Sequence, residues 1–408
     1  MISCRWLTSF VGLNFIALSL TSCHHPKTAR DIVKQATESV VLINYGDKLG
    51  QGTELIAKLQ GKTPRRQQHF TTGANSQAVD AVGIFKWGMP INVDLANALP
   101  TLTESEAAQK AEEFFNEGND YFVQQNYQQA IASYERAIAI KPDYYQAWYN
   151  RGNALRQLQR YSEAIASYEK AIAIKPDLHQ AWNNRGFALS ELKRYSDAIT
   201  SYDKAIAIKP DKYEAWINRG NDLSELKRYS EAIASYDKAI AIKPDKYEAW
   251  INRGNDLSEL KRYSEAIASY DKAIAIKPDK YEAWINRGND LSELKRYSEA
   301  IASYDKAIAI KPDKYEAWIN RGNALSELKR YSEAIASYDK AIAIKPDLDE
   351  AYYNKACSYA LQSNADQAIE NLNKAIQLAP NKYQKLAKTD PDFDKIRDDK
   401  RFQELIKL

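Results

Sequence analysis

The 408-residue sequence has few of the residues that carry most metal and redox chemistry, with three cysteines and four histidines. Cys4 lies before an apolar N-terminal stretch, and Cys23 lies just after it. His24 and His25 lie beside Cys23 but have no third ligand nearby, so we predict no metal site. No phosphate-binding loop or other cofactor signature occurs, and we expect neither a cofactor nor a small-molecule substrate.

An excess of one charge is also missing, because 57 basic residues nearly balance 54 acidic ones. The balance holds locally as well: residues 213–246 contain six acidic and six basic side chains. A surface that is neutral at this scale offers no stripe of cations to follow a phosphate backbone. Nucleic acid is therefore not an expected partner.

The apolar run at the N-terminus, from Trp6 to Leu20, is short for a membrane-spanning helix and suits a secretory signal. Its end, Leu20-Thr21-Ser22-Cys23, resembles a bacterial lipobox. That resemblance implies a signal peptide at 1–22, lipidation of Cys23, a linker at 23–30, and a protein exported to the bacterial cell envelope. Cys4 is then expected to be removed with the signal and Cys23 to be lipidated, so Cys357 is left without an intramolecular disulfide partner. His24 is not an acidic inner-membrane retention residue, which favours the outer membrane. An ordinary signal peptide or an uncleaved anchor is the alternative.

A 34-residue unit is repeated along most of the remaining sequence. Residues 212–245, 246–279 and 280–313 are identical, and 314–347 differs from them only at Ala324. A fixed period of this length is typical of stacked-repeat proteins, in which each unit packs against its neighbours. Such an array exposes an extended surface rather than a closed catalytic pocket, so we expect a binding protein and not an enzyme.

Each unit is expected to be a pair of helices. In the unit that starts at Tyr145, apolar residues recur at helical spacing over 145–157 and again over 161–174. Lys175-Pro176-Asp177 then ends the second helix, because proline cannot continue the hydrogen-bond ladder. Gly152 is small where the two helices must approach closely, and Tyr168 is expected to fill the space beside it.

This pattern resembles the tetratricopeptide repeat. The family's eight signature positions are occupied by Trp148, Arg151, Gly152, Leu155, Ala164, Tyr168, Ala171 and Pro176, of which Arg151 and Leu155 depart from the usual residue type. The resemblance implies an all-α, right-handed superhelical solenoid of eight helix hairpins over 111–382 with a C-terminal cap at 383–408. The repeats are counted as 111–144, 145–178, 179–212, 213–246, 247–280, 281–314, 315–348 and 349–382. Lysine, as at Lys227, stands between the two helices where the family favours glycine, and either strain or a different turn would accommodate it.

In this family the first helix of each hairpin lines the concave groove, which implies a peptide-binding site here. One row of asparagines recurs every 34 residues, and comprises Asn150, Asn184, Asn218, Asn252, Asn286, Asn320 and Asn354. A second row comprises Asn153, Asn221, Asn255, Asn289 and Asn323, with Phe187 in place of one member. An asparagine offers a donor and an acceptor, which suits an extended peptide backbone. The alternative is that these amides bond neighbouring helices.

The segment before the repeats, residues 31–100, resembles the first and last strands of a trypsin-like peptidase domain. Its catalytic middle is missing, because neither the family's histidine motif nor its Gly-x-Ser-Gly-Gly motif occurs. We interpret it as a small β-containing, degenerate remnant without catalytic residues.

The function that the sequence favours is a membrane-anchored scaffold that binds peptide segments of other proteins. A serine peptidase with the repeats as its substrate guide, and a purely structural spacer, are the alternatives.

Overall fold

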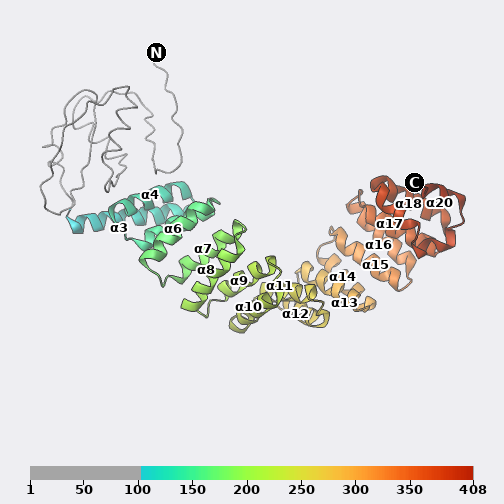
Figure 1. The fold of residues 1–408 in the computed structure, drawn as a ribbon, viewed down its shortest axis with the longest axis horizontal. Coiled ribbons are helices and arrows are strands. Elements are labelled where there is room, and N and C mark those ends of the chain that lie inside the picture. Colours follow the sequence, from blue (N-terminus) through green and yellow to red (C-terminus); the bar gives the residue numbers. More distant parts are fainter. Residues whose placement is uncertain (1–102, 408) are drawn as a thin grey trace, which may run out of the picture. The chain divides into compact units, whose positions relative to one another are not determined.

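The computed structural model describes residues 103–407, and in this range it consists of consecutive helices (Figure 1). The repeats lie in one compact unit, Lys110–Leu408. Eight helix hairpins follow one another, which confirms the expected all-α solenoid. The signal peptide expected at 1–22, Cys23 and the β-containing remnant expected at 31–100 lie outside the described residues.

The sixteen helices of the hairpins alternate between a first and a second helix. The first helices are α3 (Glu104–Val123), α5 (Tyr145–Gln157), α7 (His179–Glu191), α9 (Tyr213–Glu225), α11 (Tyr247–Glu259), α13 (Tyr281–Glu293), α15 (Tyr315–Glu327) and α17 (Asp349–Leu361). The second helices are α4 (Tyr127–Ile140), α6 (Tyr161–Ile174), α8 (Tyr195–Ile208), α10 (Tyr229–Ile242), α12 (Tyr263–Ile276), α14 (Tyr297–Ile310), α16 (Tyr331–Ile344) and α18 (Ala365–Leu378).

The hydrophobic core lies between successive hairpins as well as within each of them. In the fourth hairpin, Leu223 of α9 and Ala232 and Tyr236 of α10 pack together with Ile199, which belongs to the preceding hairpin. Each hairpin thus buries part of its apolar face against its neighbour, as the solenoid architecture requires.

Close approach of the two helices depends on one glycine in each of the first seven hairpins. A Cβ built on Gly254 of α11 would lie 2.5 Å from Cε1 of Tyr270 on α12, a side chain that is almost fully buried. The expected pairing of a small residue with a tyrosine therefore describes the actual contact.

The turn between the two helices is closed by a left-handed residue. Lys227 has a φ of 59°, and the equivalent residues in the other hairpins have similar values. The amide of Arg228 donates to the carbonyl of Leu223 at 2.8 Å, and that of Lys227 donates to Ser224 at 2.7 Å. These are the two hydrogen bonds of a Schellman motif, so lysine adopts the conformation that the family gives to glycine.

A second turn connects each hairpin to the next one, and a tryptophan fixes it. The indole of Trp250 on α11 donates to the carbonyl of Pro244 at 3.0 Å, and the same bond recurs from Trp148 to Trp318. The Lys-Pro-Asp sequence thus ends one helix and also supplies the acceptor that positions the following helix.

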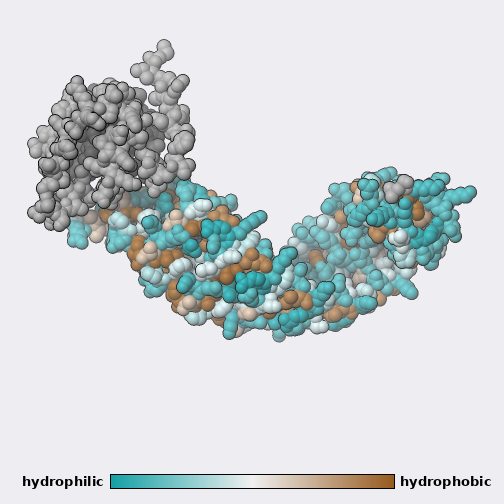
Figure 2. Space-filling view, in the orientation of Figure 1, coloured by the Kyte–Doolittle hydropathy of each residue, from teal (hydrophilic) through white to brown (hydrophobic). Residues whose placement is uncertain are grey.

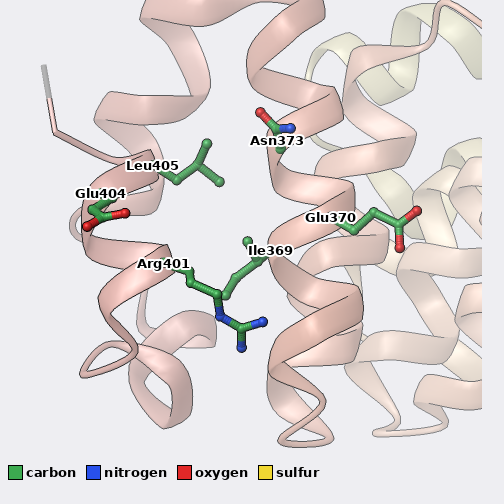
Figure 3. Close-up of a pocket in the computed structure, with 6 residues that line it drawn as sticks. All are labelled: Ile369, Glu370, Asn373, Arg401, Glu404 and Leu405. Carbon is green, nitrogen blue, oxygen red and sulfur yellow. The ribbon is translucent and has the colours of Figure 1, made fainter.

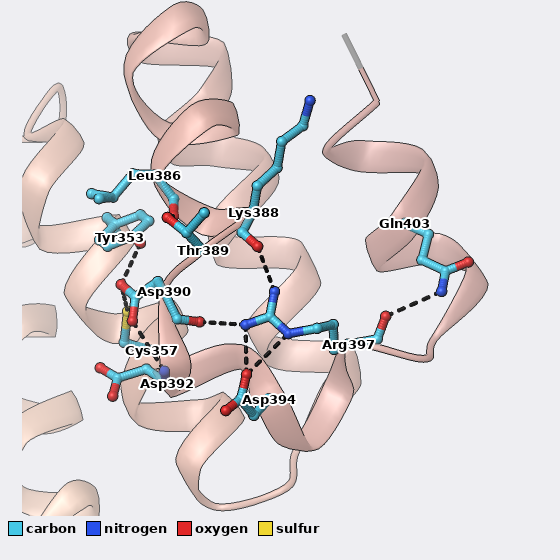
Figure 4. A network of polar contacts seen from close by, with 10 residues as sticks. All are labelled: Tyr353, Cys357, Leu386, Lys388, Thr389, Asp390, Asp392, Asp394, Arg397 and Gln403. Carbon is cyan, nitrogen blue, oxygen red and sulfur yellow. Dashed lines mark hydrogen bonds and ion pairs between the residues drawn. The ribbon is translucent and has the colours of Figure 1, made fainter.

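The C-terminal cap consists of α19 (Pro380–Ala387), the 3-10 helix η2 (Pro391–Ile396) and α20 (Lys400–Leu405). Phe393 and Phe402 of the cap are fully buried, in one apolar cluster with residues of α17 and α18. The guanidinium of Arg397 donates to the carbonyls of Lys388 and Asp390 and to the carboxylate of Asp394 (Figure 4). The cap thereby covers the apolar end of the last hairpin.

The visible surface of the repeats is mostly hydrophilic, with hydrophobic residues in separate groups (Figure 2). Within residues 103–407, no helix has the length and apolarity needed to cross a membrane.

Candidate peptide-binding surface

The two rows of asparagines lie on the first helices, and every member is half-buried. The amide Nδ2 of Asn252 on α11 donates to Oδ1 of Asn221 on α9 at 2.9 Å. That same Oδ1 accepts a second hydrogen bond, also of 2.9 Å, from the hydroxyl of the buried Tyr236. The two rows are therefore bonded to each other across neighbouring hairpins, and a core tyrosine orients each junction.

The same link recurs at most of the other junctions, from Asn150 to Asn119, Asn184 to Asn153, Asn286 to Asn255, Asn320 to Asn289 and Asn354 to Asn323. Bonding to a neighbouring helix is thus part of what these side chains do. This link uses only one polar atom of each amide. In the Asn252–Asn221 pair, Oδ1 of Asn252 and Nδ2 of Asn221 make no hydrogen bond in the described part of the chain. Each such junction leaves one acceptor and one donor without a partner among the described residues, except that Oδ1 of Asn184 accepts a hydrogen bond of 3.3 Å from Asn183.

Phe187 interrupts this arrangement on α7. The amide of Asn218 lacks its usual acceptor there and reaches Oδ1 of Asn183 at 3.5 Å instead. The guanidinium of Arg156 lies 5.3 Å from the centre of the Phe187 ring. The regular ladder is therefore divided into a short N-terminal part and a longer part over the four nearly identical repeats.

The position before each asparagine of the first row carries a row of mostly apolar residues, here called the third row: Tyr149, Ile217, Ile251, Ile285, Ile319 and Tyr353. Ile217 is half-buried, whereas Ile319 and Tyr353 are buried at 5% exposure each. The hydroxyl of Tyr353 donates to Asp390 of the cap at 2.6 Å. These residues mainly contribute to packing beside the asparagines.

The arginines that replace the family's usual leucine form a repeated polar bridge. Arg253 on α11 donates through Nε to Asp237 of α10 at 2.7 Å and through Nη1 to Ser269 of α12 at 2.6 Å. The guanidinium thus joins the second helices of two successive hairpins. The signal for this bridge was present in the sequence, since an acid and a serine recur sixteen residues before and after each arginine, but it was not recognised.

Three buried aspartates were also missed by the sequence analysis. Asp222, Asp256 and Asp290 are only 2–3% exposed, and Oδ1 of each accepts a hydrogen bond of 2.6 Å from a serine of the preceding first helix. Oδ2 of each has no hydrogen-bond partner. Burial raises the pKa of each of these carboxyls to about 6. Ala324 occupies the same position in the next repeat, a difference that could have drawn attention to the three aspartates.

Two cavities lie near the ends of the array. One of about 390 Å³ lies between α18 and α20 (Figure 3). Its Arg401 is already paired with Asp366 and Asp399. The other, of about 410 Å³, adjoins the first asparagines of the ladder, and is lined by Asn119, Phe122, Val123, Tyr134, Asn150 and Asn153.

Cys357 replaces an asparagine of the second row on α17, where it is buried close to Asp390 and Asp392 (Figure 4). Burial raises the pKa of its thiol well above the ordinary value. The nearby carboxylate of Asp390 already accepts hydrogen bonds from Tyr353 and from the backbone amide of Asp392. We therefore regard this cluster as part of the packing between the last hairpin and the cap.

Comparison with known families agrees with this geometry. Models described as "Tetratricopeptide repeat" match residues 115–179, five successive units from 179 to 348, and residues 349–382. The matches run without a gap over more than half of the chain. The chain belongs to the tetratricopeptide repeat family.

Tetratricopeptide repeat proteins are scaffolds for protein interactions, and one of the similar solved structures supports the fold. The C-terminal part of a repeat protein from Cytophaga hutchinsonii is 19% identical, with a TM-score of 0.52, and the match covers 64% of this chain and all of that one. YrrB, described as a repeat protein with an unusual peptide-binding site, is 25% identical with a TM-score of 0.42, over 46% of this chain and 97% of its own. A protein from Parabacteroides merdae is 18% identical with a TM-score of 0.45, over 61% of this chain and 99% of its own. No curated protein matches the chain.

Proposed function

We propose that the protein is a scaffold that holds an extended segment of another protein along the asparagine rows of its first helices. The observation that carries this proposal is the pattern of half-used amides. In the junctions between α9 and α17, one row keeps a free acceptor and the other keeps a free donor, at intervals set by the repeat. An extended backbone presents donors and acceptors at regular intervals, and amide pairs of this kind can satisfy them.

The amides are already held in one orientation before a ligand binds. Each Oδ1 of the second row is fixed by a buried tyrosine hydroxyl and by the next asparagine, so its Nδ2 is held in place before a ligand arrives. Groups that are already ordered lose little conformational entropy on binding. A pre-ordered row is therefore a better ligand surface than the same number of mobile side chains.

The proposal is tested with a display library of random 12-residue peptides selected on the full-length chain. Selected peptides are then compared on the chain and on a variant with Asn218, Asn252, Asn286 and Asn320 changed to alanine. We expect the variant to lose at least tenfold in affinity, since every bound peptide would lose several hydrogen bonds. Circular dichroism checks that the variant is folded.

Those four side chains are suitable because they donate to their neighbours and leave no buried hydroxyl unpaired when removed. Changing Asn221 would instead deprive Tyr236 of its acceptor. Selected peptides that bind the chain and the variant equally, or a library that yields no binder, would show that the asparagine rows do not bind peptides.

We further propose that Cys23 is lipidated and anchors the scaffold in the cell envelope. The motivating observation is the sequence Leu20-Thr21-Ser22-Cys23 after an apolar run. Metabolic labelling with a clickable palmitate analogue should mark the chain and not its Cys23→Ser variant, and the variant should leave the membrane fraction. Equal labelling of both would contradict lipidation at this residue.

A further inference from the structure

The first helix of each central repeat carries one continuous polar stripe. On α9 the stripe consists of Glu214, Asn218, Asn221 and Glu225, which are spaced by four, three and four residues. At 100° per residue these four positions fall within roughly 60° of one another, so they share one face of the helix. Both glutamates are exposed, and the two asparagines lie between them. We call this face the Glu-Asn-Asn-Glu stripe.

The stripe is repeated on the next three first helices. Its glutamates are Glu214, Glu225, Glu248, Glu259, Glu282, Glu293, Glu316 and Glu327. None of them forms an ion pair within residues 103–407, whereas other acids of the same repeats do. Asp237 pairs with Arg253 and Glu231 pairs with Arg228, both at 2.7 Å. Apart from Asp347, the exposed acids of these four repeats that form no ion pair therefore lie on the face that also bears the free amides.

Most cations of each repeat are held away from the stripe, although the pKa of Lys246 is raised by Tyr213 and also by the charge of Glu248. Arg253, the one cation of α11, is 19% exposed and is held by Asp237. Lys246 places its ammonium 5.1 Å from the centre of the Tyr213 ring. Lys227 lies in the turn between helices and Lys238 on the second helix, and both are exposed. A whole repeat is nearly neutral, yet each stripe carries two carboxylates that form no ion pair; the second of them, as in Glu259, only accepts a long hydrogen bond of 3.5 Å from a tyrosine hydroxyl.

The buried aspartates add further negative charge next to the second glutamate of each stripe. Asp222 has an unpartnered Oδ2, and the charges of Glu225 and Glu191 add to the effect of burial in raising the pKa of its carboxyl. Neighbouring carboxylates that repel one another, as these do, would be stabilised by a nearby cation. The same holds for Asp256 beside Glu259 and for Asp290 beside Glu293.

We propose that the four central stripes bind an extended partner segment that carries lysine or arginine side chains on both edges of its backbone. This inference rests on the proposed function and specifies the chemistry of the partner. Eleven residues separate Glu214 from Glu225, so the two acidic rows lie about 16 Å apart with the asparagines between them. Side chains of an extended backbone bound to the asparagines alternate between its two edges, and each long cationic side chain reaches one acidic row.

Three labelled peptides provide the test, each with three copies of a four-residue unit: Lys-Lys-Thr-Thr, Gln-Gln-Thr-Thr or Glu-Glu-Thr-Thr. In each unit, neighbouring charged residues fall on opposite edges of an extended chain. Fluorescence anisotropy on the full-length protein should show the lysine peptide binding at least tenfold more tightly than the glutamine peptide. The advantage should shrink between 50 mM and 500 mM salt, because added ions screen exposed charges.

Two matched variants separate the stripe from net charge. The stripe variant changes the eight glutamates of the stripes to glutamine. The control variant removes the same number of charges elsewhere, by changing Glu231, Glu265, Glu299 and Glu333 to glutamine and Asp245, Asp279, Asp313 and Asp347 to asparagine. The stripe variant should bind the lysine and glutamine peptides within threefold of each other, and the control should keep the tenfold preference.

The outcomes distinguish this inference from the proposed function. Equal loss of preference in both variants would assign the effect to net charge and overturn the inference. Equal binding of the lysine and glutamine peptides, with dependence on the asparagines intact, would overturn the inference and leave the scaffold function standing. The same conclusion follows if display-selected peptides bind and none of the three designed peptides does. Absence of binding by any peptide, selected or designed, would overturn both.

Discussion

At the scale of single residues, the repeats use lysine in a backbone conformation that glycine adopts at lower cost. Lys227, Lys261 and Lys295 have φ values of 58–59° and complete the turn between the two helices. A left-handed residue with a Cβ costs about 1 kcal/mol relative to glycine. The exposed lysine side chains form no ion pair in the described part of the chain that would offset this cost.

Replacing one of these lysines with glycine should therefore stabilise the array. We expect Lys261→Gly to raise the free energy of unfolding by about 0.5–1 kcal/mol, measured by urea denaturation. Lys272→Gly, in the interior of α12, serves as the control and should lower it by about 1 kcal/mol. A loss of stability at Lys261 would mean that its side chain contributes more than the strain costs.

The glycines of the first helices should respond in the opposite way. Gly254→Ala would favour the helix but would place Cβ 2.5 Å from the Tyr270 ring. Because Tyr270 is fully buried, we expect a net loss of about 1–3 kcal/mol in calorimetry or denaturation. Adding Tyr270→Leu should make the alanine tolerable, so that the two changes are not additive. Additive losses would indicate that the glycine acts through something other than this contact.

These residue-level contacts show how far the sequence could be used for prediction. Gly152 and Tyr168 could be paired from their spacing, because both partners lie within one hairpin whose geometry the period determines. The hydrogen bond from Asn252 to Asn221 could not, because it depends on how two successive hairpins are rotated against each other. The 34-residue period located the asparagine rows. The hydrogen bonds between the two rows, and the amide atoms that these bonds leave free, could be identified only from the structure.

At the scale of helices, the junctions between successive first helices contain the array's least satisfied groups. Asp256 on α11 packs beside Ser224 of α9 with one carboxylate oxygen unpartnered. The charged groups that act on it include Glu259 of its own helix, and it in turn acts on Tyr229, Tyr236 and Tyr270 of the second helices. No cation among residues 103–407 is found to offset the charge of the carboxylate, so its ionisation should weaken the junction.

Stability should consequently fall as the pH rises. The folded-state pKa of Asp222, Asp256 and Asp290 is about 6, above the ordinary value of 3.8, so the folded state holds these protons more tightly than the unfolded state. The resulting stabilisation is complete below about pH 4 and is lost as the pH rises through 6, on the order of 2 kcal/mol for each aspartate. Urea denaturation at pH 5 and pH 8 measures about half of this change, because the unfolded aspartates are already ionised at pH 5.

A triple variant supplies the control, with Asp222, Asp256 and Asp290 changed to alanine as in the natural repeat that carries Ala324. Its stability should change less between pH 5 and pH 8, and at pH 8 it should exceed that of the unmodified chain. If the two proteins keep the same dependence on pH, the loss of stability does not arise from these aspartates.

At the scale of the whole molecule, the identical repeats make length a variable that can be changed without altering any local contact. Deleting residues 246–279 joins Asp245 to Lys280, which is the same junction that Asp245 makes with Lys246. The shortened chain should fold, because each hairpin interacts almost entirely with its immediate neighbours. The slope of its unfolding free energy against denaturant concentration should be smaller, because the shorter chain exposes less surface on unfolding.

Binding should decrease with the number of stripes, and this separates a ligand surface from a spacer. If the lysine peptide binds across several stripes, removing residues 246–279 should weaken it, and removing 246–313 should weaken it further, by more than tenfold in all. Anisotropy titrations of the three chains measure the series. A mechanical spacer would instead give one unchanged affinity at every length, since any binding would then reside in the varied repeats at either end. A graded loss therefore requires that the identical units themselves contact the partner.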